Sequence, residues 1–227
     1  PIHTTVEQGF TTTPEQIESA ITPKTKAILL NFPCNPTGVI MSKEELEAIA
    51  KVCIKHNLLV ISDEIYAELT YGAKHHSIAS FPGMRERTVV ISGVSKAFAM
   101  TGWRIGYLAA PEALVKGIAK VHQFALMCSP TAGQYAAVEA FRHGRPEVER
   151  MVNEYAKRRE IIVRRFKEMG LDIYEPKGAF YAFPSIKKTG MTSSEFCEAL
   201  LKAEQVAVVP GSAFGEAGEG YVRVSYA

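Results

Sequence analysis

Several polar residues with chemical potential stand directly after apolar, strand-like runs in this sequence of 227 residues. Asn35, Asp63 and Lys96 each follow such a run within a few positions. Ligands of open parallel sheets bind in the crevice outside the carboxyl ends of the strands. We therefore expect these three side chains to meet at one edge of a sheet, and this edge is the candidate site.

Lys96 is the residue of this set that could form a covalent bond to a ligand. Desolvation beyond a buried strand penalises the ammonium form, and a neutral amine is a nucleophile towards an aldehyde. A lone lysine is more often a solvated surface residue. Whether Lys96 is a nucleophile or a solvated surface lysine therefore depends on the residues around it.

The elements that must position these residues can be inferred from hydrophobic patterns and helix caps. Ser42 with Glu45 makes a capping box for a helix of about 15 residues, and Asn57 suits its C-terminal end. Apolar strands at 27–32 and 58–62 flank this helix. The order strand, helix, strand predicts a right-handed parallel crossover, and continuous apolar strands predict a sheet covered on both faces.

The second part of the chain changes pattern after a long amphipathic helix at 147–169, for which Gly170 is the expected C′ residue. We predict an α/β fold, with a mainly parallel sheet sandwiched by helices in residues 1–145. A smaller α+β domain, entered through the long helix, is expected in residues 146–227. The other expected elements are strands at 88–92, 105–109, 180–183, 206–209 and 221–225 and a helix at 193–203.

Bulk composition excludes several classes of function. The net charge of +2 gives no electrostatic case for a nucleic-acid partner, and no apolar run reaches the roughly 18 to 20 residues of a membrane helix. The cysteines are far apart and form no CxxC pair, which argues against a zinc site and a disulfide framework and favours a cytoplasmic location. Lys157-Arg158-Arg159 is expected on the wet face of a helix. His75-His76 is expected to be solvated, and we predict no metal site.

The run from Ser92 to Tyr107, SGVSKAFAMTGWRIGY, resembles the cofactor-lysine signature of class I aminotransferases of the fold-type I pyridoxal-phosphate family. Gly93, Ser95 and Arg104 occupy the expected positions around Lys96. The same family order continues over the whole chain, with Asn35-Pro36-Thr37-Gly38, Asp63-Glu64-Ile65-Tyr66, Lys96, Arg104 and finally Arg223 in YVRVS.

The resemblance implies a role for each landmark. Lys96 would hold pyridoxal 5′-phosphate as a Schiff base, and Asp63 would pair with the pyridine nitrogen. Asn35 and Tyr66 would hydrogen-bond the phenolic oxygen of the cofactor, and the Asn35-Pro36 peptide bond is expected to be cis.

Two arginines complete the implied set. Arg104 would grip the cofactor phosphate together with the hydroxyl of Ser95 or Ser92, between which the sequence does not choose. Arg223 would receive the substrate α-carboxylate. The segments PKGAFY at 176–181 and PGSAFG at 210–215 resemble family segments near the substrate, but we expect them to serve mainly as turns.

The family further implies an amino acid and a 2-oxo acid as substrates, with aspartate or an aromatic amino acid expected, and a homodimer. Family members normally supply a phosphate-binding loop and a ring-stacking aromatic residue from preceding sequence. We therefore expect this chain to lack the N-terminal part and the extreme C-terminus, and to bind the cofactor weakly alone. A pyridoxal-phosphate lyase on the same fold and a non-catalytic sensor domain remain the alternatives.

Overall fold

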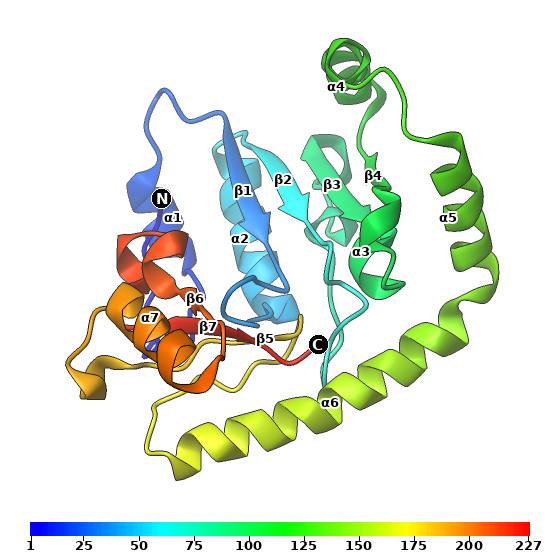
Figure 1. The fold of residues 1–227 in the computed structure, drawn as a ribbon. Helices are drawn as coiled ribbons and strands as arrows, with labels where there is room; N and C mark the ends of the chain where they lie inside the picture. The colour runs from blue at the N-terminus through cyan, green and yellow to red at the C-terminus, as the bar shows by residue number, and fades with distance from the viewer.

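The computed structural model describes all residues from 1 to 227 and confirms the predicted fold class (Figure 1). The main sheet has the order β1 (Ala27–Asn31), β2 (Leu59–Asp63), β3 (Thr88–Gly93) and β4 (Gly106–Ala109). The first three strands are parallel, and β4 pairs with β3 in the antiparallel direction. The carboxyl ends of β1 to β3 therefore lie at one edge of the sheet.

Helix α2 (Lys43–Lys55) connects β1 to β2 as predicted and covers one face of the sheet. Ser42 and Glu45 form the expected capping box. Asn57 takes a left-handed conformation with φ 48° just past the helix, as a C′ residue does. The largest apolar cluster lies between α2, the short helix α1 (Pro14–Ala20) and strand residues such as Leu30 and Val60.

The opposite face of the sheet is more open than the sequence predicts. Leu29 there is 67% exposed, and Ile91 and Leu108 are also exposed. Helix α4 (Glu112–Ala125) lies beyond the end of β4 and has no buried residue, whereas α5 (Thr131–His143) lies alongside the sheet (Figure 1). The expectation that helices cover both faces is thus met on one face.

Helix α6 (Arg145–Glu168) is the long amphipathic helix that the sequence predicts, and it spans the molecule from α5 to the small sheet (Figure 1). Gly170, the C′ residue of this helix, has a φ of +75°, and the backbone bonds around it make a Schellman motif. The expectation that Arg159 is solvated is wrong. Its guanidinium donates to the carbonyl of Pro176 at 2.8 Å and packs over the Tyr71 ring at 5.3 Å.

The smaller part of the chain holds an antiparallel sheet with the order β5 (Tyr181–Ala182), β7 (Val222–Ser225) and β6 (Val209–Pro210). Helix α7 (Ser193–Glu204) lies beside it and begins at a capping box on Thr192. The strand expected at 206–209 is shorter and later than predicted. No helix of the structure is both long and apolar enough to cross a membrane.

The two sheets are joined by backbone hydrogen bonds at Gly38. Its carbonyl accepts from the N–H groups of Lys177 and Gly178, at 2.8 and 2.9 Å. Gly38 has φ +70°, and a Cβ at this position would lie 2.3 Å from the Cβ of Pro176. Any larger residue would therefore push the loop after β1 away from the segment that leads into β5.

We predict that Gly38→Ala lowers the free energy of unfolding by about 3 kcal/mol or more, because it adds a backbone clash to an unfavourable φ. The matched control is Gly72→Ala, at φ +66° with no atom within 4 Å of the added Cβ. The control should cost only about 1 to 2 kcal/mol, the strain of a left-handed alanine. Urea unfolding measures both values, and equal losses would contradict the clash.

Candidate active site

Lys96 lies on the single-turn helix α3 (Val94–Ala97), directly after β3. Its Nζ atom is 5.8 Å from the centre of the Tyr66 ring and 5.9 Å from that of Phe180. Tyr66 follows β2, whereas Phe180 precedes β5. The lysine is half-buried. It lies at the ends of the parallel strands, as the sequence predicts, and it also faces the junction between the two sheets.

Arg223, on β7, contacts the loop that follows β1. Its NH1 group donates to Oδ1 of Asn35 at 2.9 Å. Because the amide oxygen of Asn35 faces the arginine, its Nδ2 group remains a donor for another acceptor. This orientation agrees with the role that the resemblance gives Asn35, which is donation to an oxygen of the cofactor.

Tyr66 is buried, and its hydroxyl lies 3.0 Å from the hydroxyl of Tyr181. Burial raises the pKa of Tyr66 well above its usual range, and the hydrogen bond with Tyr181 raises it further. Tyr66 therefore keeps its proton at neutral pH. A protonated hydroxyl is a donor, as the resemblance requires of this residue.

Two aromatic rings lie against the guanidinium of Arg223. Its Cζ atom is 4.5 Å from the centre of the Tyr181 ring and 5.1 Å from that of Phe214. Sequence analysis assigned the segments that carry these rings to turns and gave them no role in the site. The segment GAFY and the segment PGSAFG were the available signals, since both sit beside expected strands.

Asp63 is the last residue of β2 and is half-buried. Its Oδ1 atom accepts from the backbone N–H of Ile65 at 3.2 Å. In register, Asp63 pairs with Asn31 of β1 and with Ile91 of β3. The carboxylate thus lies at the centre of the parallel strands, on the open face of the sheet.

Arg104 and Ser95 are brought together by Thr101. The guanidinium of Arg104 donates to the Thr101 carbonyl at 2.9 Å, and the Thr101 hydroxyl donates to the Ser95 carbonyl at 3.1 Å. The hydroxyl of Ser92 instead donates to the carbonyl of Glu64 at 3.4 Å. Ser95 is thus linked to Arg104 through Thr101, whereas the Ser92 hydroxyl is turned towards the carbonyl of Glu64.

A buried polar cluster behind Asp63 was missed in the sequence. The Glu64 carboxylate accepts from the hydroxyls of Ser62 at 2.9 Å and Ser77 at 2.7 Å, and it lies 2.9 Å from Nε2 of His75. The expectation that His75 is solvated is wrong, since its side chain is 16% exposed. Its contact with Glu64 spans a loop, so neighbouring residues gave no signal.

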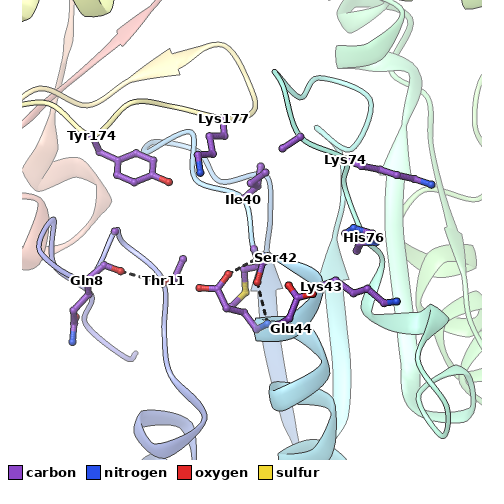
Figure 2. A pocket seen from close by; sticks show the side chains of 14 residues that line it. Gln8, Thr11, Ile40, Ser42, Lys43, Glu44, Lys74, His76, Tyr174 and Lys177 are labelled. Atoms are coloured by element: carbon purple, nitrogen blue, oxygen red, sulfur yellow. Dashed lines mark hydrogen bonds between the residues drawn. The ribbon is translucent and has the colours of Figure 1, made fainter.

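A separate cavity of about 540 Å³ opens at the start of α2 (Figure 2). Lys177 and Tyr174 enter it from one side, and Ser42 and Glu44 lie across from them. None of the candidate residues Asn35, Asp63, Tyr66, Ser95, Lys96, Arg104 and Arg223 lines it. The Ser42 hydroxyl accepts from the N–H of Glu45 at the start of α2. The candidate residues lie instead between the strand ends and β7.

The donor set around Lys96 fits the chemistry of pyridoxal 5′-phosphate. Lys96 supplies an amine, and Asp63 supplies a carboxylate. Asn35 and Tyr66 supply two donors for a phenolic oxygen. Arg104 with Ser95 adds a guanidinium and a hydroxyl, which suit a phosphate dianion. The free Nδ2 donor of Asn35 is the observation that fits most closely, because its oxygen is already bound to Arg223.

Comparison with known proteins identifies the family. The sequence model described as "Aminotransferase class I and II" matches residues 1–227, and the chain belongs to this family. It is 50% identical over 224 residues to the aspartate aminotransferase of Pyrococcus abyssi and to the aromatic-amino-acid aminotransferase 2 of Thermococcus litoralis. Each alignment covers 97% of this chain and 58% of the relative.

A solved structure shows the same fold. The aromatic aminotransferase from Pyrococcus horikoshii superposes with a TM-score of 0.95 at 48% identity, over 99% of this chain and 61% of that one. The chain thus spans about 58% of the length of the curated relatives that it matches.

The Glu64 cluster generates a pH-dependent prediction. Burial alone would raise the pKa of Glu64, but the bonds from His75, Ser77 and Ser62 outweigh it and hold this pKa below its usual value. A lowered folded-state pKa stabilises the fold above the ordinary pKa of glutamate, and this stability is lost as the pH falls through the folded-state value.

We expect Glu64→Gln to lower the free energy of unfolding at pH 7 by about 1 to 3 kcal/mol, the cost of a buried hydrogen-bonded charge. At an acid pH below the lowered folded-state pKa of Glu64, where this carboxyl is protonated in the wild type, the difference should shrink. Urea titrations at both pH values measure it, with the exposed Glu47→Gln as the control. An equal difference at both pH values would contradict the charged state of Glu64.

Proposed function

We propose that the complete protein transfers an amino group from an L-amino acid to a 2-oxo acid, with pyridoxal 5′-phosphate on Lys96. The observation that supports this most is the hydrogen bond of Arg223 to Asn35, beside the Tyr66 ring that Lys96 faces. It brings a group suited to a substrate carboxylate next to groups suited to the cofactor. The family membership of the chain supports the same reaction class.

The bound cofactor would supply an electron sink for the carbanion formed at the substrate α-carbon. Asp63 is proposed to pair with the pyridine nitrogen, and Asn35 and Tyr66 to donate to the phenolic oxygen. Arg104 and Ser95 would hold the phosphate. Arg223 would bind the α-carboxylate as a charge-assisted pair, which orients the α-carbon towards Lys96.

Lys96 is proposed as the catalytic base once its amine is free. Its Nζ atom would carry the proton from the substrate α-carbon to the C4′ carbon of the cofactor, and would move it in the opposite direction in the second half of the reaction. The rings of Tyr66 and Phe180 lie beside this Nζ atom, with their centres 5.8 and 5.9 Å from it. The two half-reactions together give ping-pong kinetics.

For the substrate, we propose aspartate or an aromatic amino acid. Two of the relatives at 50% identity are named for one and for the other, and both substrates would share the carboxylate contact with Arg223. We further propose a cytoplasmic homodimer and a division of the chain into domains at 1–145 and 146–227. The start of α6 at Arg145 supports this boundary.

A lyase on the same scaffold is the second candidate, since cofactor contacts alone do not separate the two reactions. Product analysis with aspartate, phenylalanine and cystathionine distinguishes them. Formation of the matching 2-oxo acid only when an amino acceptor is present indicates transfer. Release of ammonia or of a thiol without an acceptor indicates elimination.

Lys96→Ala should abolish amino transfer in the complete protein and remove the visible absorbance of the bound cofactor that borohydride reduces. The control is Lys177→Ala, an exposed lysine of the cavity in Figure 2, which should keep both properties. Absorbance spectra before and after borohydride, together with stopped-flow half-reactions, provide the measurement. A Lys96→Ala variant with normal rates and a reducible adduct would refute the assignment.

Arg223→Gln should lower kcat/KM by roughly 10- to 150-fold, the value of a charged hydrogen bond, for every amino acid that the protein accepts. The loss should be similar among substrates, because the carboxylate is the group that they share. Arg85→Gln, in the short 3-10 helix that precedes β3 at the opposite edge of the sheet, is the control. A loss confined to one substrate would assign Arg223 to side-chain recognition instead.

A further inference from the structure

Tyr181 occupies a position between two groups of the proposed site, although no role follows for it from the sequence. Its hydroxyl lies 3.0 Å from that of Tyr66, and its ring centre lies 4.5 Å from Cζ of Arg223. The side chain is buried, with 7% of its surface exposed. One residue thus touches both the group proposed for the cofactor oxygen and the group proposed for the substrate carboxylate.

The direction of the hydrogen bond between the two tyrosines follows from a count of protons. Each hydroxyl carries one proton, and a single proton lies between the two oxygens. If Tyr66 donates its proton to the phenolic oxygen of the cofactor, Tyr181 has to be the donor in the pair. A hydroxyl that accepts a hydrogen bond is polarised and becomes a stronger donor itself.

The ring of Tyr181 has a separate task from its hydroxyl. Together with Phe214 it holds the guanidinium of Arg223, whose planar face suits such packing. The charged groups that face the tyrosine pair are Arg223, Asp63 and Lys96. Ring and hydroxyl can be removed independently, so the two tasks can be tested independently.

We propose that Tyr181 is a positioning residue that acts on the cofactor oxygen through the Tyr66 hydroxyl and on the substrate carboxylate through Arg223. This inference rests on the proposed function, since it needs the cofactor oxygen beside Tyr66. It gives the GAFY segment a part in the site. Tyr181 acts on the reacting groups through the side chains of Tyr66 and Arg223.

The test of the hydroxyl is Tyr181→Phe in the complete protein with bound pyridoxal phosphate. The readout is the pH midpoint of the visible absorbance of the cofactor, which reports protonation of the Lys96 nitrogen attached to it. Weaker donation from Tyr66 leaves more negative charge on the neighbouring oxygen, which holds that proton more tightly. The midpoint should rise by about 0.5 to 1 pH unit, the size expected of one neutral hydrogen bond.

Three further variants make the result specific. Tyr66→Phe should shift the midpoint in the same direction and further, and adding Tyr181→Phe to it should change nothing more. Tyr174→Phe, whose hydroxyl faces the cavity of Figure 2, should leave the midpoint unchanged. Thermal unfolding of each variant checks that the fold is kept.

The test of the ring uses an unreactive carboxylate, maleate or 3-phenylpropionate, whichever the wild type binds. Tyr181→Phe should bind it within twofold of the wild type, whereas Tyr181→Leu should bind it about threefold or more weakly, since the contact with Arg223 is lost. Equal affinity in both variants would show that the ring of Tyr181 does not hold Arg223 in place.

The outcomes separate the inference from the function on which it rests. If Tyr66→Phe shifts the midpoint and Tyr181→Phe does not, the inference is overturned while the proposed function stands. If the wild type shows no titrating absorbance on Lys96, the proposed function fails and the inference with it. A shift in Tyr181→Phe that persists in the Tyr66→Phe background would show that Tyr181 acts by another route, which also overturns it.

Discussion

The hydrogen bond from Arg223 to Asn35 is the contact on which the candidate site depends. It joins residues 188 positions apart in the sequence and ties the loop after β1 to β7 of the small sheet. A guanidinium at such a place needs an acceptor, because burial of an unpaired charge is costly. The amide oxygen of Asn35 meets this need, and the same contact leaves the Nδ2 group of Asn35 as a donor for another acceptor.

Aromatic residues make up much of the remaining support. Tyr181 and Phe214 flank Arg223, while Tyr66 and Phe180 face Lys96. Tyr66 also packs edge to face with Phe180 and Tyr181. Such packing fixes the orientation of rings and hydroxyls at little cost in side-chain entropy. The positions of the charged groups therefore depend on rings that come from both sheets, and on the backbone bonds at Gly38 that hold the two sheets together.

The parts of the fold that sequence predicted well are those encoded by neighbouring residues. The capping box at Ser42 and Glu45 and the left-handed Gly170 each lie within a few positions of the helix end that they determine. The cis bond at Asn35-Pro36 was expected from the resemblance and is present. Helices α1, α4 and α5 were not predicted, and the open face of the sheet was expected to be covered.

Contacts between residues far apart in the chain could not be predicted from the sequence. The sequence placed Asn35, Asp63 and Lys96 at one edge because parallel strands end together. It assigned no site role to Tyr181, whose bond to Tyr66 spans 115 positions, and it did not predict that His75 turns inward to Glu64 across a loop. The link from Ser95 to Thr101 and the bond from Ser92 to Glu64 are likewise contacts that spacing alone does not reveal.

The attachment of the cofactor to Lys96 is tested most directly by peptide mapping. The complete protein is incubated with pyridoxal phosphate, reduced with borohydride and digested, and mass spectrometry locates the phosphopyridoxyl group. The account predicts one stoichiometric label, on the peptide that carries Lys96. A label on another lysine, or a label spread over several exposed lysines with none enriched at Lys96, would contradict it.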